Sequence, residues 1–174
     1  MSRLSIPAVV DAPAASQPLL AVVHKKLGVV PNLMKLLGQS PAALEGYLSL
    51  SGALDKGVLN AKLRETLALA VAEFNGCDYC LAAHSYIGKN LVKLTDDEIA
   101  QARDGRAADA RNDAALRFAQ RVAAERGRVL DADIAALRAA GFSDAETVEI
   151  VLHVALNVLT NYVNNVAHTD VDFP

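Results

Sequence analysis

The sequence lacks several features that would point to particular kinds of protein. It contains no tryptophan, and aromatic residues make up only 5% of its 174 residues. Its core must therefore be built from leucine, valine, isoleucine and alanine. No block of lysine or arginine occurs and the formal net charge is −3, which argues against a nucleic-acid partner. No run of about 18 apolar residues occurs either, which argues against a membrane-spanning helix.

Cysteine is also scarce. The two cysteines, Cys77 and Cys80, are separated by only two residues. They therefore do not join distant segments, as the disulfides of small secreted proteins do. Residues 1–17 contain one arginine and no sustained apolar segment, unlike a secretory signal peptide. We therefore expect a cytoplasmic protein in a reducing compartment.

Helix-forming residues and helix-boundary signals are abundant. Hydrophobic residues make up 52% of the chain, and no segment alternates as a half-buried strand does. Thr95–Glu98 and Ser143–Glu146 have the spacing of capping boxes. We predict an all-α, single-domain helical bundle over residues 18–174, preceded by an extended or irregular arm over 1–17. The helices are expected at about 19–27, 32–37, 41–56, 61–74, 77–91, 96–105, 110–126, 131–140 and 144–167.

The apolar content also predicts self-association. A mean hydropathy of +0.22 is high for a small soluble monomer. The last predicted helix is apolar over most of residues 148–166. Part of that surface is expected to be buried between subunits of a homo-oligomer.

Cys77, Cys80 and His84 form the most informative cluster in the sequence. On a helix they stand at positions i, i+3 and i+7, so they share one face. Cys77 follows the Asn75-Gly76 break and lies at the helix N-terminus, where free backbone amides favour a thiolate. A C-x-x-C pair also allows one oxidised sulfur to be resolved by the other as a disulfide. The pattern therefore predicts redox chemistry.

Glu65 is the predicted partner of His84. If residues 61–74 and 77–91 form an antiparallel hairpin about Gly76, Glu65 lies about 11 residues before the turn and His84 about eight after it. At ~1.5 Å per residue, the two are within roughly one helical turn in depth. A Glu65–His84 hydrogen bond would orient the imidazole and increase its basicity, as in a catalytic triad.

These residues resemble the signature of a known superfamily. Arg64-Glu65, eleven residues, Cys77-Asp78-Tyr79-Cys80, three residues and His84 together resemble the alkylhydroperoxidase D / carboxymuconolactone decarboxylase superfamily. Two further segments resemble its peroxidase-related branch: Pro31-Asn32-Leu33, and the C-terminal Asn157-Val158-Leu159-Thr160-Asn161-Tyr162 followed by Asp172-Phe173-Pro174. The resemblance covers most of residues 25–174.

The resemblance implies an all-helical fold that assembles into trimers or hexamers, without a metal or any other cofactor. It implies reduction of a hydroperoxide substrate, in which Cys80 attacks the peroxide and Cys77 resolves the sulfenic acid as a disulfide. His84 and Glu65 match the residues that relay protons in the family. It further implies a dithiol reductant, such as a lipoyl-type protein donor, for the disulfide.

Tyr79 departs from the pattern, because the characterised peroxidases of this family carry a histidine next to the second cysteine. A tyrosine hydroxyl with an unperturbed pKa of about 10 is a poor base at neutral pH. It can still donate a hydrogen bond, so Tyr79 is a candidate pocket residue. The proton relay is then shorter, and a lower peroxidase rate is expected.

Several other interpretations remain open on the residues alone. Cys77 and Cys80 could be small core residues, or could bind zinc with His84 and a fourth ligand such as His153 or His168. A cofactor-free decarboxylase, a lactone-processing enzyme and a non-enzymatic redox-sensing oligomer are further alternatives. His153, Asn157 and Asn161 recur every four residues on the last helix. They could line the active-site pocket, which makes His153 a second candidate pocket residue. They could also form polar subunit contacts, or be the solvated stripe of an otherwise apolar helix.

Overall fold

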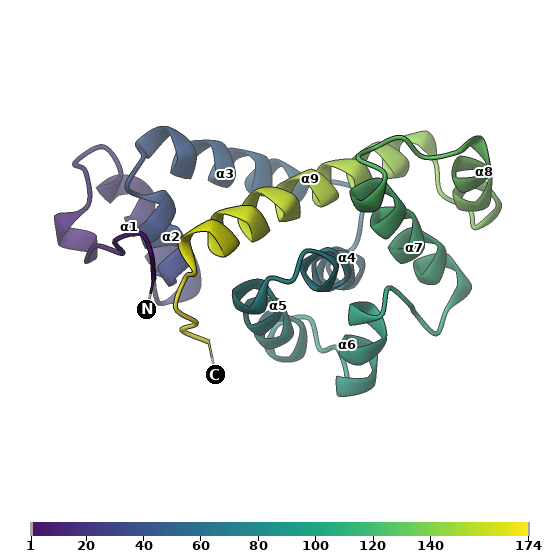
Figure 1. Cartoon of the computed structure of the whole chain (residues 1–174), viewed down its shortest axis with the longest axis horizontal. Helices are drawn as coiled ribbons and strands as arrows, with labels where there is room; N and C mark the ends of the chain where they lie inside the picture. Colours follow the sequence, from purple (N-terminus) through teal and green to yellow (C-terminus); the bar gives the residue numbers. More distant parts are fainter. Residues whose placement is uncertain (1, 174) are drawn as a thin grey trace.

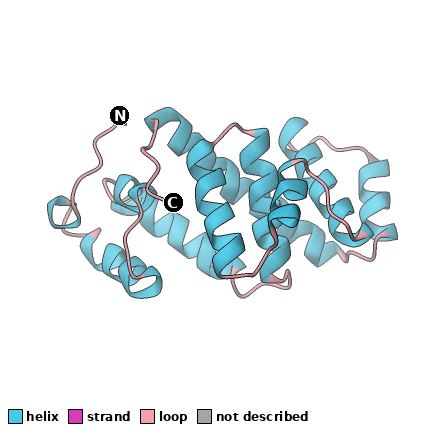
Figure 2. Ribbon diagram, turned by 90° about the horizontal axis from the view of Figure 1, so that it is seen from below, coloured by secondary structure: helices cyan, strands magenta, loops and turns pink. Residues whose placement is uncertain are grey.

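The computed structural model describes residues 2–173, and the regular elements in that range are helices (Figures 1 and 2). The prediction of an all-α fold is therefore confirmed for the described chain, which forms a single domain. The elements are the 3-10 helix η1 (Val9–Asp11) and the α-helices α1 (Gln17–Leu27), α2 (Asn32–Leu37), α3 (Pro41–Leu54), α4 (Ala61–Phe74), α5 (Asp78–Asn90), α6 (Asp96–Arg103), α7 (Ala110–Ala124), α8 (Asp131–Ala139) and α9 (Asp144–Ala167).

The helix boundaries follow the signals in the sequence. Ser40 and Asn60 each accept a hydrogen bond from the backbone amide three residues later. Both expected capping boxes are present, with Thr95 and Glu98 bonded reciprocally at α6 and Ser143 and Glu146 at α9. These side chains satisfy amides that have no partner within the helix, so each helix begins where its cap stands.

Helix α4 is the centre of the bundle and packs against α5, α6, α7 and α9 (Figure 1). Residues 67–72 of α4 are all buried, and half of them are alanine, which lets neighbouring helices approach closely. The buried residues of α4 are Leu63, Leu67, Ala68, Leu69, Ala70, Val71 and Ala72. Helix α9 crosses the length of the molecule and contacts α3, α4, α5 and α7 (Figure 1). Among residues 2–173, no helix has both the length and the apolar character needed to cross a bilayer.

The turn between α4 and α5 sets the position of the cysteines. Gly76 adopts a left-handed conformation with φ of +60°, which a side chain would strain. The Cys77 amide donates to the Ala72 carbonyl at 3.0 Å, and the Gly76 amide donates to the Glu73 carbonyl at 3.0 Å. These bonds close the end of α4 and reverse the chain at once. Helix α5 therefore begins directly beside the end of α4.

The two ends of the described chain lie together against α9 and α2. The Arg3 amide donates to the Ala167 carbonyl at 2.6 Å, and the Ser2 hydroxyl donates to Asp170 Oδ2 at 3.0 Å. Before α1 the chain is irregular apart from η1, and Ala12 and Ser16 are buried. Met1 and Pro174, the latter part of the C-terminal motif noted above, lie outside the described residues.

Candidate active site

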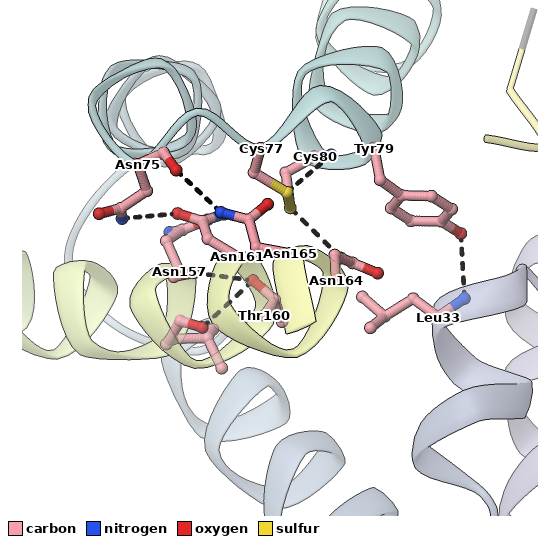
Figure 3. Close-up of a disulfide and its surroundings, with 11 residues drawn as sticks. Leu33, Asn75, Cys77, Tyr79, Cys80, Asn157, Thr160, Asn161, Asn164 and Asn165 are labelled. Carbon is pink, nitrogen blue, oxygen red and sulfur yellow. Dashed lines mark hydrogen bonds between the residues drawn. A yellow bond between two sulfur atoms is a disulfide. The ribbon is translucent and has the colours of Figure 1, made fainter. Parts of the chain in front are cut away.

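Cys77 and Cys80 form a disulfide at the start of α5, between that helix and α9 (Figure 3). Their Cα atoms are 5.3 Å apart. Cys77 is the N-cap of α5, and its Sγ accepts a hydrogen bond from the Cys80 amide at 3.2 Å. Both side chains are buried. The sulfur atoms therefore lie at the positive end of a helix, where an anionic sulfur is stabilised.

His84 and Glu65 meet across the α4–α5 hairpin. His84 Nδ1 lies 2.8 Å from Glu65 Oε2, and the side chains are 23% and 18% exposed. Because a carboxylate only accepts, we assign the Nδ1 proton to His84. The contact predicted from the hairpin is present. It leaves Nε2, which has no protein partner among residues 2–173, as the nitrogen able to exchange a proton with a reacting group.

A row of asparagines on α9 faces the turn that carries the cysteines (Figure 3). Asn75 donates from Nδ2 to Asn161 Oδ1 at 2.9 Å, and Asn165 donates from Nδ2 to the Asn75 carbonyl at 2.8 Å. Asn164 donates from Nδ2 to Cys80 Sγ at 3.3 Å. The sequence indicated a polar stripe on this helix that included Asn161. Asn164 and Asn165 were missed, although they follow Asn161 by three and four residues and so continue the stripe at helical spacing.

Tyr79 lies between the cysteines in sequence, but its side chain points away from the sulfur atoms (Figure 3). Its hydroxyl accepts from the Leu33 amide at 3.1 Å and donates to Asp172 Oδ1 at 2.9 Å. Burial raises the pKa of Tyr79 well above its ordinary value, and the nearby Asp172 carboxylate raises it further. The hydroxyl therefore stays protonated and joins α2 to the C-terminal segment.

His153 is buried on α9, 5% exposed, and its Nε2 has no hydrogen-bond partner in the described part of the chain. Burial lowers the pKa of His153, and the nearby Arg64 guanidinium lowers it further. Asn157 donates from Nδ2 to the His153 carbonyl at 2.8 Å, so its amide bonds to its own helix. The structure therefore favours the neutral form of His153 and does not join it to the Glu65–His84 pair by a hydrogen bond.

The described residues do not supply a set of metal ligands. No group of three or more histidine, cysteine, aspartate or glutamate side chains between residues 2 and 173 is arranged to hold a metal ion. The zinc interpretation therefore lacks a ligand set in this range. What the site does offer is a pair of sulfurs able to exchange two electrons, and an imidazole–carboxylate pair on the same helical hairpin.

Comparisons with known proteins give the family and the fold. Residues 41–125 match the Carboxymuconolactone decarboxylase family. A curated Haemophilus influenzae protein, described as uncharacterized, is 46% identical over 48 residues. That match covers 27% of this chain and 42% of the relative, so less than half of the relative's length is spanned.

Two solved structures resemble nearly the whole chain. One is described as an alkylhydroperoxidase AhpD core, an uncharacterized peroxidase-related protein from Ralstonia eutropha JMP134. It has a TM-score of 0.87 and 28% identity, covering 98% of this chain and 92% of that one. The other, an uncharacterized peroxidase-related protein from Silicibacter sp. TM1040, has a TM-score of 0.85 and 25% identity, covering 97% and 91%.

Proposed function

This chain belongs to the alkylhydroperoxidase D-like / carboxymuconolactone decarboxylase superfamily, and from that premise we propose that it is a thiol-dependent peroxidase. The observation that carries the proposal is the Cys77–Cys80 disulfide at the N-terminus of α5, on the same hairpin as the Glu65–His84 pair. The family also includes decarboxylases. A cysteine pair able to form a disulfide favours redox chemistry over that alternative.

The proposed reaction begins with the reduced pair. The Cys80 thiolate attacks one peroxide oxygen, the O–O bond breaks, and the departing alkoxide takes a proton to become an alcohol. Cys80 is then a sulfenic acid. His84 Nε2 first takes the proton of the Cys80 thiol, and the charged ring, oriented by Glu65, then returns that proton to the alkoxide directly or through one water. Tyr79 takes no part in this relay, because its hydroxyl is held by Leu33 and Asp172.

Resolution follows within the same turn of helix. The Cys77 thiolate attacks Cys80 Sγ, the S–O bond breaks, and the released hydroxide is protonated to water. The two cysteines have then lost two electrons, which reduced the peroxide to an alcohol and water. An external dithiol, for which a lipoyl-type protein is our candidate, returns the two electrons and becomes a disulfide itself. We place this cycle in the reducing cytoplasm, in a homo-oligomer such as a trimer or hexamer.

The test is steady-state turnover of an organic hydroperoxide, such as tert-butyl hydroperoxide, with dihydrolipoamide as reductant. The parent protein should consume hydroperoxide catalytically, and Cys80→Ser should abolish the reaction. Turnover by Cys80→Ser equal to that of the parent would refute the assignment. A decarboxylase or lactone-processing enzyme would instead keep its activity when both cysteines are serine.

A further inference from the structure

We propose that Asn164 is a further catalytic residue, whose side-chain amide stabilises the thiolate of Cys80. The inference deepens the proposed function and rests on it, because it takes Cys80 as the reacting sulfur. It assigns a role to a residue of α9 that lies 84 positions after Cys80 in the sequence.

The contact itself is direct. Asn164 Nδ2 lies 3.3 Å from Cys80 Sγ, and both residues are only 3% exposed. Figure 3 shows the Asn164 side chain reaching from α9 to the disulfide. A hydrogen bond from an amide to an anionic sulfur is stronger than one to a neutral sulfur, because the acceptor carries a charge. The buried setting strengthens it further, because little water competes for the donor.

The neighbours of Asn164 hold it in place. Asn161 and Asn165, on either side of it along α9, are both bonded to Asn75 at the end of α4. These two bonds fix α9 against the turn that carries Cys77 and Cys80. The amide is therefore placed before the reaction begins and needs no reorganisation when charge develops on the sulfur.

The other end of the Asn164 side chain argues against a purely structural role. Its Oδ1 is buried and has no hydrogen-bond partner among residues 2–173. A buried polar atom without a partner is costly, and an apolar side chain of similar size would avoid that cost. Among residues 2–173 this side chain makes its hydrogen bond to sulfur, so the donor to Cys80 is what the asparagine contributes.

The two sulfurs receive their hydrogen bonds from different elements. Cys77 Sγ accepts from the Cys80 backbone amide, a bond that the start of α5 supplies by itself. Cys80 Sγ accepts from Asn164.

The Asn164 amide also assists the step in which the disulfide is reduced. When a reductant thiolate bonds to Cys77 Sγ, the S–S bond breaks and Cys80 leaves as a thiolate facing Asn164.

The test measures the pKa of the Cys80 thiol in the reduced protein, from the pH dependence of its alkylation by iodoacetamide. Mass spectrometry separates Cys80 from Cys77. Asn164→Leu keeps the approximate shape of the side chain and removes the donor. We expect the Cys80 pKa to rise by about one unit, which slows alkylation about tenfold at a pH below both values. The other titratable groups around the pair, His84, Glu65, Asp78 and Tyr79, are the same in both proteins, and the facing asparagines of α9 do not titrate.

Asn157→Leu is the matched control. Asn157 is also a buried asparagine of α9, but its amide bonds to the His153 carbonyl and not to sulfur. This variant should lose stability without moving the Cys80 pKa. If Asn164→Leu does not fold, Asn164→Asp, which has the same shape and places a carboxylate against the sulfur, should raise the pKa further.

The outcomes separate this proposal from the proposed function. The role of Asn164 is overturned if the Cys80 pKa is unchanged in the folded Asn164 variant. It is also overturned if Asn157→Leu shifts the Cys80 pKa by the same amount. Alkylation uses no peroxide, so a shifted pKa supports the amide–thiolate interaction even if the parent reduces no hydroperoxide. In that case peroxidase function fails while the thiolate-stabilising role stands.

Discussion

His84 Nδ1 and Glu65 Oε2 lie 2.8 Å apart, so a carboxylate of α4 fixes the orientation of an imidazole on α5. The bond occupies one ring nitrogen and leaves the other for proton transfer. It also provides a negative charge beside the ring when the ring is protonated. Both effects depend on the carboxylate and not only on the shape of Glu65.

Glu65→Gln should therefore slow the oxidation of Cys80 by hydroperoxide. Glutamine can still accept a hydrogen bond, but it does not stabilise a charged imidazole and can turn its NH₂ group towards the ring. We expect a loss of about 10- to 100-fold, smaller than the ~10²- to 10⁴-fold that an acid–base residue itself contributes, because His84 is still present. Stopped-flow measurement of single-turnover oxidation checks the rate.

Glu73→Gln is the control for this variant. Glu73 lies on the same helix, but its carboxylate accepts from Arg103 Nε at 2.6 Å at an exposed position. The same chemical change there should leave the rate of Cys80 oxidation within about twofold of the parent. Equal rates for Glu65→Gln and Glu73→Gln would show that the Glu65–His84 pair does not assist the reaction.

The different roles of the two cysteines predict different trapped products. Cys77→Ser keeps the attacking sulfur and removes the resolving one, so one equivalent of hydroperoxide should leave a sulfenic acid on Cys80. Dimedone should then add to Cys80, as read by peptide mass spectrometry. Cys80→Ser should give no such adduct on Cys77. An adduct on Cys77 in that variant, formed as fast as the one on Cys80, would show that Cys80 is not the preferred attacking sulfur.

Local signals made much of this molecule predictable from sequence. The caps of α6 and α9 and the Gly76 turn are encoded within a few residues, so the helices and the Glu65–His84 contact followed from spacing. The contact between Cys80 and Asn164 did not, because it depends on how α9 packs across the bundle. A stripe of asparagines indicates a polar face, but nothing local indicates what that face meets.

The contacts of Tyr79 also depend on packing between elements that are distant in the sequence. Its place between two cysteines suggested a pocket residue, yet the start of α5 directs its hydroxyl to the first turn of α2. There the Leu33 amide donates to Tyr79, and the Asn32 amide donates to Asp172 Oδ2 at 2.8 Å. The N-cap of α2 is Pro31, which has no side-chain acceptor, so Tyr79 and Asp172 satisfy these amides in its place.

Tyr79→Phe should consequently destabilise the fold without altering the thiols. The change leaves the buried Leu33 amide without its acceptor and removes one hydrogen bond to Asp172. A loss of about 1–3 kcal/mol in the free energy of unfolding is expected for an orphaned buried donor. Urea denaturation measures the loss, and iodoacetamide alkylation should give the parent's thiol pKa values.

Tyr86→Phe is the companion variant. Tyr86 is 39% exposed, and its ring contacts Phe173 with centroids 6.0 Å apart, a contact that phenylalanine keeps. Its unfolding free energy should lie close to the parent's. If Tyr79→Phe were as stable as Tyr86→Phe, the hydrogen bonds of the Tyr79 hydroxyl to α2 and to the C-terminal segment would not stabilise the fold.

The stability of the fold should fall in mildly acidic solution because of His153. Burial, assisted by the Arg64 guanidinium, lowers its pKa in the folded state. The unfolded chain, where the pKa is about 6.5, then binds a proton more readily than the folded chain does. The stability that neutral His153 allows is therefore fully present above pH ~6.5 and is lost as the pH falls from there through the folded pKa.

His153→Leu, which is neutral at every pH, should flatten the dependence of the unfolding free energy on pH in this range. The same change at the exposed His24 should leave that dependence as in the parent. Urea denaturation at a series of pH values between 5 and 8 checks the profile, and an equal slope in the parent and in His153→Leu would show that other groups govern it.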